Sequence, residues 1–405
     1  MSYSALVAKT WDQAILSSVL LELTYRCNLD CVICYNDRMQ QGVLLEEADY
    51  LRLLEDLAAL QVLNLVLSGG EPLAHPDFWR IGRCARELGF LVRIKSNGHA
   101  LGPALARRLR DEVAPFMIDL SLHGACAATH DRQTRIPGSF ARLMDNLRTL
   151  QDLGLRLKLN SPLTAWNEAE IEAMFALADE LGLRLSVDTR LTPRDDGDVG
   201  PLELSASVEG IRQALHLQRA KADRDGRNVR DPSDAAPKAE SSHHCGAGSS
   251  TLAVDPYGNV FPCVQWRQSL GNLHDSRIAD LWKGSKALVR IRSITAQVKT
   301  HFQSLQEGDR LSGFCPALAE QRTGSPLLLD PETRKRLMIF KNLIRYCKPH
   351  VAQQFYGAFG KLIQEAVDLG AERFEVIGPA MQVGHVLAQF APEFFNGVAP
   401  RGISG

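Results

Sequence analysis

The chain has 405 residues, of which 45% are hydrophobic and 23% are charged, and its formal net charge is -1. This composition is typical of a globular protein, and the near-neutral charge gives no electrostatic basis for binding nucleic acid or a membrane surface. Because the N-terminal segment has no apolar stretch long enough for a signal peptide or a membrane span, we expect a cytoplasmic protein with no membrane partner.

Short apolar runs alternate with amphipathic segments over residues 18–190. The runs predicted as strands are 19–24, 62–67, 90–95, 116–122, 155–160 and 183–189. The segments predicted as helices are 46–60, 76–88, 102–112, 139–153 and 168–181. Strands rich in Val, Leu and Ile that alternate with helices predict a parallel sheet with right-handed crossovers. We therefore predict an α/β fold in which residues 15–200 form a partial (β/α)6 barrel of the TIM type.

The second half of the chain divides into three predicted parts. Residues 201–242 are expected to hold a helix and a flexible linker, since 219–242 is rich in charge, Pro and Ser and has no apolar periodicity. Residues 243–330 form a small cysteine-bearing domain, in which the sequence DPYGN at 255–259 predicts the turn of a β-hairpin. Residues 331–405 are predicted to be a mostly helical C-terminal extension.

Nine cysteines are present, and three of them, Cys27, Cys31 and Cys34, lie within eight residues directly after the first predicted strand. Clustered cysteines in a reducing cytosol are metal ligands or catalytic groups more often than disulfides. A structural zinc site needs four protein ligands, and no fourth Cys or His stands near this trio in the sequence. Three thiolates on an iron–sulfur cubane instead leave one iron open to an external ligand. A zinc site completed by a distant ligand stays open as the alternative.

The sequence TYRCNLDCVICY at 24–35 resembles the Cys-x3-Cys-x2-Cys motif of the radical S-adenosylmethionine (SAM) superfamily. The sequence SGGEP at 68–72, after the second predicted strand, is similar to the Gly-Gly-Glu motif of that family. The resemblance extends over roughly 18–200. It implies a catalytic 4Fe–4S cluster on the three cysteines, with SAM chelated at the open iron. Paired glycines let a backbone approach a ligand closely, and Glu71 is expected to accept a hydrogen bond from the methionine amino group.

Small polar residues follow the later predicted strands, and barrels of this kind place their sites at those strand ends. The resemblance implies that they contact the ribose and the methionine carboxylate of SAM, while Ile33 and Tyr35 cover the adenine. The predicted cofactor contacts are Ile33, Tyr35, Ser68, Gly69, Gly70, Glu71, Ser96, Asn97, Ser121, Asn160 and Arg190. Near the barrel mouth, His123 is expected to face substrate or solvent, and burial is the favoured expectation for Cys126.

Cys245 and Cys263 belong to a Cys-x12-Gly-x4-Cys spacing. This spacing resembles the start of the SPASM or twitch auxiliary-cluster domains of peptide- and protein-modifying radical SAM enzymes. Cys315 is the best third ligand, and the cysteine count supports at most one auxiliary iron–sulfur cluster. The candidates for the fourth ligand are Cys347, His243, His244 and an exogenous or substrate group. A zinc site built from the same residues is the alternative.

The resemblance implies reductive cleavage of SAM to a 5′-deoxyadenosyl radical, which abstracts hydrogen from a substrate. The auxiliary-cluster spacing favours a maturase that oxidises or crosslinks a ribosomally made peptide or a protein. Such an enzyme would need an external one-electron donor of the flavodoxin or ferredoxin type. Because the N-terminus is too short for a leader-recognition domain, we also expect a separate leader-peptide recognition protein. The alternatives are an enzyme of tetrapyrrole, haem or other small-molecule cofactor biosynthesis, and a SAM-binding iron–sulfur protein without turnover.

Overall fold

The computed structural model describes residues 3–224, 241–304 and 314–335. Most of the predicted linker, Cys347 and nearly all of the predicted C-terminal helical extension therefore lie outside the described residues.

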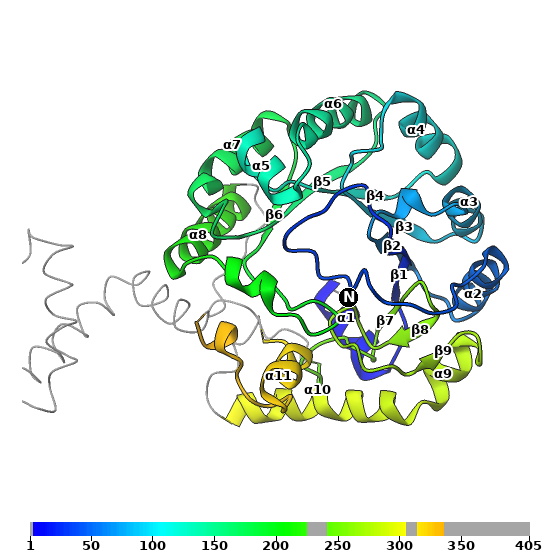
Figure 1. The fold of residues 1–405 in the computed structure, drawn as a ribbon. Coiled ribbons are helices and arrows are strands. Elements are labelled where there is room, and N and C mark those ends of the chain that lie inside the picture. Colours follow the sequence, from blue (N-terminus) through cyan, green and yellow to red (C-terminus); the bar gives the residue numbers. More distant parts are fainter. Residues whose placement is uncertain (1–2, 225–240, 305–313, 336–405) are drawn as a thin grey trace, which may run out of the picture. The chain divides into compact units, whose positions relative to one another are not determined.

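Six parallel strands form the curved sheet that the apolar runs predict (Figure 1). They are β1 (Ser18–Thr24), β2 (Asn64–Gly69), β3 (Leu91–Ser96), β4 (Met117–Ser121), β5 (Leu157–Pro162) and β6 (Leu185–Asp188). Each strand pairs with its neighbour in chain order, and each begins and ends within one or two residues of a predicted run. The partial (β/α)6 barrel is confirmed.

Helices cover the outer face of this sheet (Figure 1). The α-helices of this part are α1 (Tyr3–Asp12), α2 (Glu47–Ala59), α3 (Phe78–Glu87), α4 (Pro103–Arg108), α5 (Ala127–Thr134), α6 (Ser139–Asp152), α7 (Ile171–Glu180) and α8 (Val208–Arg224). Shorter helical turns are η1 (Pro72–Ala74), η2 (Leu109–Val113), η3 (Glu168–Glu170) and η4 (Gly200–Leu204). The helix α2 shows why they dock, since its buried side chains Tyr50, Leu53, Leu54 and Leu57 recur at helical spacing and form one apolar stripe.

The cysteine-bearing segment continues the barrel sheet beyond β1. Its strands are β7 (Thr251–Val254), β8 (Asn259–Phe261) and β9 (Gly271–Asn272), and β7 pairs with β1 in parallel. The strands β7 and β8 form the predicted hairpin, and Gly258 takes a φ of +81° in its turn. Because β7 runs parallel to β1, the hairpin turn lies at the same edge of the sheet as the cysteine loop that follows β1.

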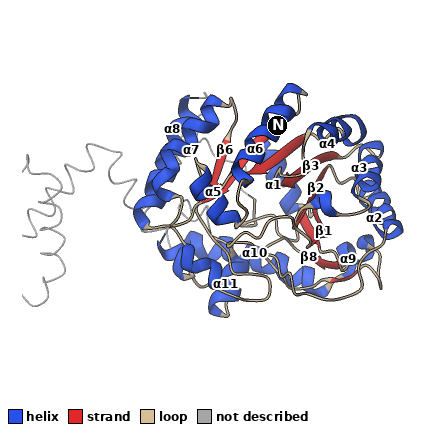
Figure 2. Ribbon diagram, turned by 45° about the horizontal axis from the view of Figure 1, so that its top comes forward, coloured by secondary structure: helices blue, strands red, loops and turns tan. Residues whose placement is uncertain are grey.

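Three helices complete the cysteine-bearing segment: α9 (Ile278–Gly284), α10 (Lys286–Ser304) and α11 (Pro316–Thr323). Figures 1 and 2 show α10 and α11 side by side below the barrel. Their apolar side chains form a core with Trp266 and Phe314, against which three half-buried cysteines pack. None of the helices in the described residues has the length and apolarity needed to cross a membrane.

Candidate functional site

A cavity of about 650 Å³ opens at the carboxyl ends of the barrel strands, and it is within the size range of small-molecule sites. The predicted residues that line it are Cys27, Cys31, Ile33, Cys34, Tyr35, Ser68, Gly69, Gly70, Ser96, Asn97, Ser121, Asn160 and Arg190. The structure thus brings together in one cavity residues that follow six different strands. Glu71 belongs to the predicted set but does not line the cavity as described.

The three cysteines of the first motif are half-buried on the irregular loop after β1. Backbone hydrogen bonds from Asp30 and Val32 to the last residues of α5 hold this loop, and Cys34 closes a turn onto the carbonyl of Cys31. Burial, followed by the neighbouring thiols of Cys34 and Cys27, raises the pKa of Cys31 to about 12. Thiols this close together stay ionised only beside a cation, and a metal cluster provides that positive charge.

The two glycines of the second motif bring β2 against the backbone of the cysteine loop. The amide of Gly70 donates to the carbonyl of Thr24 at 2.7 Å, and the next amide donates to the carbonyl of Arg26 at 2.9 Å. A Cβ on Gly70 would lie 2.5 Å from that Arg26 oxygen, and Gly69 has a φ of +124°. The glycines therefore serve a close approach between two stretches of backbone as well as lining the cavity.

The carboxylate of Glu71 is buried behind the glycines, with 1% of the residue exposed. It accepts hydrogen bonds from the Ser96 hydroxyl and from the backbone amides of Asn97 and Leu73, all between 3.0 and 3.2 Å. Burial raises the pKa of Glu71 to about 7, although these donors lower it. In this structure Glu71 fixes the turn after β3, and its contact with the methionine amino group of SAM stays a prediction.

Two polar side chains of the cavity lining, Asn97 and Arg190, carry groups suited to SAM. The Nδ2 of Asn97 lies 3.7 Å from the Sγ of Cys27 and 2.7 Å from the Oδ1 of Asn28. The Nη1 of Arg190 is buried and finds no hydrogen-bond partner among the described residues. A buried guanidinium nitrogen without an acceptor is costly, and a carboxylate is the acceptor that fits it best. The residues present therefore fit a ligand that carries a carboxylate, as SAM does.

The three later cysteines, Cys245, Cys263 and Cys315, pack against the same apolar core of the auxiliary segment. Burial, followed by the neighbouring thiols of Cys263 and Cys315, raises the pKa of Cys245 to about 12. The ring of His243 is hydrogen-bonded to Thr295, and the Nε2 of His244 to the carbonyl before Cys315. In the described residues no three His, Cys, Asp or Glu side chains converge on one metal-ion position. A cubane instead distributes its thiolates over separate iron atoms.

Several cavity residues were missed from the sequence. Asp119 stands two residues before Ser121 on β4, so the alternation of a strand places both on the inner face. Val264 and Gln265, directly after Cys263, also line the cavity, and no local pattern indicates this.

Two expectations near the barrel mouth need correction. His123 lines the cavity but is 6% exposed and hydrogen-bonded to Gln133, so it is not a solvated tip. Burial lowers its pKa to about 3, which keeps the ring neutral. The favoured expectation that Cys126 is buried is wrong: it is exposed at the start of α5, where its Sγ contacts Glu170.

Two protein-family models match the chain: the radical SAM superfamily over residues 21–178, and an iron–sulfur cluster-binding domain, SPASM, over residues 245–306. Residues 21–178 form a radical SAM domain. The cofactors of this family are a 4Fe–4S cluster and SAM, and the SPASM segment of this radical SAM chain adds auxiliary iron–sulfur binding.

Relatives of known function cover most of the chain. An AdoMet-dependent heme synthase of Methanosarcina barkeri is 26% identical over 337 residues, which is 76% of this chain and 94% of the relative. A PqqA peptide cyclase of Gluconobacter oxydans is 28% identical over 322 residues, or 78% and 89% of the two chains. The solved structure of native anSMEcpe with bound AdoMet and Cp18Cys peptide has a TM-score of 0.64 at 16% identity. The match covers 84% of this chain and 98% of that one, and it shows that the two chains share a fold.

Proposed function

We propose that this radical SAM enzyme oxidatively modifies or crosslinks a peptide or protein substrate. One observation carries the proposal: Val264 and Gln265, next to the auxiliary cysteine Cys263, form part of the lining of the main cavity. A substrate in this cavity therefore lies between the cysteine loop and the auxiliary segment. The similarity to a PqqA peptide cyclase supports a peptide as the substrate.

In this proposal Cys27, Cys31 and Cys34 hold the catalytic cluster, and Cys245, Cys263 and Cys315 hold the auxiliary cluster. When bound, the catalytic cluster and SAM would supply a 5′-deoxyadenosyl radical that takes one hydrogen atom from the substrate, and the auxiliary cluster would accept the remaining electron as a proton leaves. The chain's own share is binding, orientation and exclusion of water.

The cavity residues divide this work by their chemistry. Arg190 binds the methionine carboxylate through its unpartnered Nη1, and Asn97 orients the ligand beside Cys27. Ile33 and Tyr35 cover the adenine, since both line the cavity on the cysteine loop. The predicted polar contacts that complete this binding are Ser68, Ser96, Ser121 and Asn160.

Two partners belong to the proposal. Cleavage of SAM consumes one electron for each molecule, so an external one-electron donor of the flavodoxin or ferredoxin type must supply it. A separate leader-peptide recognition protein would deliver the substrate peptide to the cavity.

A second candidate is a radical SAM enzyme that modifies a haem precursor or another tetrapyrrole. It is favoured by one observation, the 26% identity to an AdoMet-dependent heme synthase that extends over 94% of that relative. The two candidates share the cofactors and differ only in the molecule that enters the cavity.

The test uses the anaerobically reconstituted full chain with SAM, a strong reductant and candidate precursor peptides encoded beside its gene. We expect 5′-deoxyadenosine together with a peptide that has lost two hydrogen atoms, both measured by mass spectrometry. No 5′-deoxyadenosine from a chain with its clusters confirmed by spectroscopy would refute radical chemistry. Turnover of a tetrapyrrole with every peptide unchanged would select the second candidate.

The auxiliary cysteines need their own control. A variant with C245A, C263A and C315A should contain less iron per chain and should lose the peptide oxidation while the cysteine loop stays intact. If its iron content equals that of the unmodified chain, these cysteines hold no cluster.

A further inference from the structure

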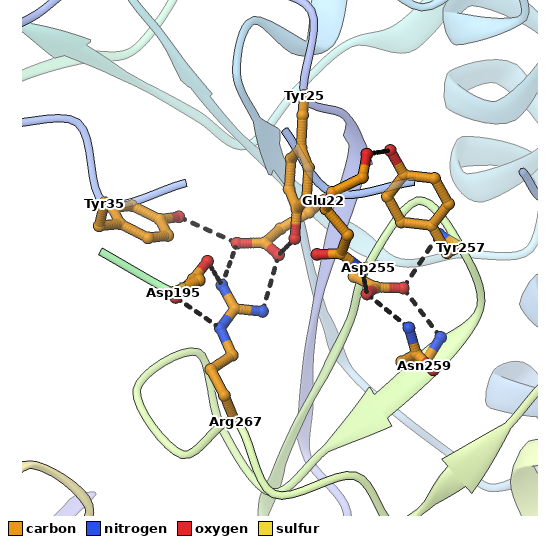
Figure 3. Close-up of polar contacts among 9 residues, drawn as sticks. Glu22, Tyr25, Tyr35, Asp195, Asp255, Tyr257, Asn259 and Arg267 are labelled. Carbon is orange, nitrogen blue, oxygen red and sulfur yellow. Dashed lines mark hydrogen bonds and ion pairs between the residues drawn. The ribbon is translucent and has the colours of Figure 1, made fainter. Parts of the chain in front are cut away.

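A buried carboxylate lies at the root of the cysteine loop. Glu22 stands in the middle of β1, and its residue is 0% exposed. Its Oε2 accepts a hydrogen bond from the hydroxyl of Tyr25 at 3.0 Å, and its Oε1 accepts one from the hydroxyl of Tyr35 at 3.1 Å (Figure 3). Because Tyr25 precedes Cys27 and Tyr35 follows Cys34, one carboxylate holds both ends of the cysteine loop.

The partner of this carboxylate comes from the auxiliary segment. Arg267, four residues after Cys263, donates its Nη1 and Nη2 to the two oxygens of Glu22, each at 3.0 Å (Figure 3). Its Nε donates to Asp195 at 2.9 Å, and the amide of Asp195 donates to the carbonyl of Tyr35 at 2.8 Å. Such a fork of parallel donors fixes the direction of the carboxylate as well as its charge.

The same segment touches the loop a second time, through the turn of the β7–β8 hairpin. Tyr257 donates its hydroxyl to the carbonyl of Gln40 at 2.6 Å, and the Gln40 side chain donates to Asp255 at 3.0 Å. The ring of Tyr257 also meets the ring of Tyr25 edge-on, with 6.1 Å between their centroids. Asp255 holds the turn itself by accepting from the amides of Tyr257 and Asn259.

We propose that Arg267 is a positioning residue through which the auxiliary iron–sulfur segment sets the geometry of the catalytic cysteine loop. Glu22 orients the two tyrosine hydroxyls only while its own charge is paired, since a buried carboxylate without a partner must take up a proton or water. When Arg267 is replaced, the two ends of the loop are released together. The two iron–sulfur sites are thereby coupled through the fold, whichever substrate the enzyme takes.

The test compares three full-length variants. R267M removes the charge and keeps most of the side-chain length, whereas R267K keeps the charge without the fork. The control is R277M, because Arg277 also joins the auxiliary segment to the barrel through an ion pair with Asp56 but does not contact the cysteine loop. Two quantities are measured without any substrate: hydrogen exchange of backbone amides at 25–36 in the reduced, iron-free chain, and SAM binding to the reconstituted chain by its change of the reduced-cluster EPR signal.

We expect R267M to speed exchange at 25–36 by about tenfold and to weaken SAM binding by about tenfold, with R267K between R267M and the unmodified chain. R277M should match the unmodified chain in both measurements. If R267M does not fold, R267K decides the question. Unchanged exchange at 25–36 and unchanged SAM affinity in the folded variants would overturn the proposal, and so would equal effects of R277M and R267M.

Discussion

Replacing Gly70 by alanine tests whether the glycine pair serves the approach of two backbones. A Cβ at this position would lie 2.5 Å from the carbonyl oxygen of Arg26 and 2.8 Å from that of Tyr25. Both contacts are to backbone, so no flexible side chain can swing away. The adjacent hydrogen bonds, from Gly70 to Thr24 and from Glu71 to Arg26, resist a separation of the two strands. The new methyl group must therefore displace the residue that directly precedes Cys27.

The magnitude follows from two opposing effects. Forcing an extra methyl group into a well-packed site costs about 1–3 kcal/mol, and the upper end applies where only backbone can yield. Replacing glycine by alanine raises the free energy of unfolding by about 0.4–1 kcal/mol, because it lowers the entropy of the unfolded chain. We expect a net loss of about 2 kcal/mol in the free energy of unfolding, together with reduced iron binding on the displaced loop.

The assay is urea unfolding of the reduced, iron-free chain followed by circular dichroism, with iron per chain measured after reconstitution. The matched control is Gly284→Ala at the end of α9, where a Cβ would meet nothing within 4 Å. G284A should be as stable as the unmodified chain or slightly more so. If G70A shows the same unfolding midpoint and the same iron content as G284A, the steric reasoning is refuted.

Two further predictions concern the cavity. R190M should weaken SAM binding by about tenfold in equilibrium dialysis, because a charge-assisted hydrogen bond to the carboxylate is lost. R184M, a substitution outside the cavity, should leave the affinity unchanged. Equal affinities of R190M and R184M for SAM would contradict this role of Arg190. Burial lowers the pKa of His123 to about 3 and that of His130 to about 4. The neutral rings therefore stabilise the fold fully above pH 6.5, the pKa of a histidine in the unfolded chain. This stability is lost as the pH falls from 6.5 towards the pKa values of the folded state. Between pH 7 and pH 5 each ring should lower the free energy of unfolding in urea by about 2 kcal/mol, and H123Q should remove the share of His123. If H123Q lost as much stability between these pH values as the unmodified chain, this reasoning would be wrong.

The strands and most of the cavity could be predicted from the sequence because their signals are local. An apolar run such as 62–67 marks a buried strand, and a polar residue at its end marks the mouth of a barrel, whatever the rest of the chain does. The ion pair of Glu22 has no such signal beyond a lone carboxylate in an apolar run. Its partner lies 245 residues away, and the chain contains 46 lysines and arginines. Only the folded chain shows that Arg267 is the partner.

Glu71 shows a different limit. The motif predicted an acceptor for a ligand, whereas the described carboxylate faces the turn after β3. Sequence spacing brings Glu71 to the right strand end, but the direction of its side chain follows from the hydrogen bonds that it accepts from Ser96, Asn97 and Leu73. Such hydrogen bonds depend on differences in position of less than an ångström, which sequence spacing alone does not convey.

The pairing of β7 with β1 explains why the auxiliary segment belongs to the catalytic site and is not merely attached to it. Without β7, the apolar strand β1 would be an exposed edge with unpaired backbone groups, which proteins normally avoid. The cysteine loop begins where β1 ends and has no regular structure of its own, so its backbone must be fixed by neighbours. The barrel supplies some of them, and Arg267 and the hairpin turn supply the rest. A chain truncated before residue 243 would therefore lack the strand that pairs with β1 and the contacts that fix the cysteine loop. It should bind iron and SAM more weakly than the full chain does.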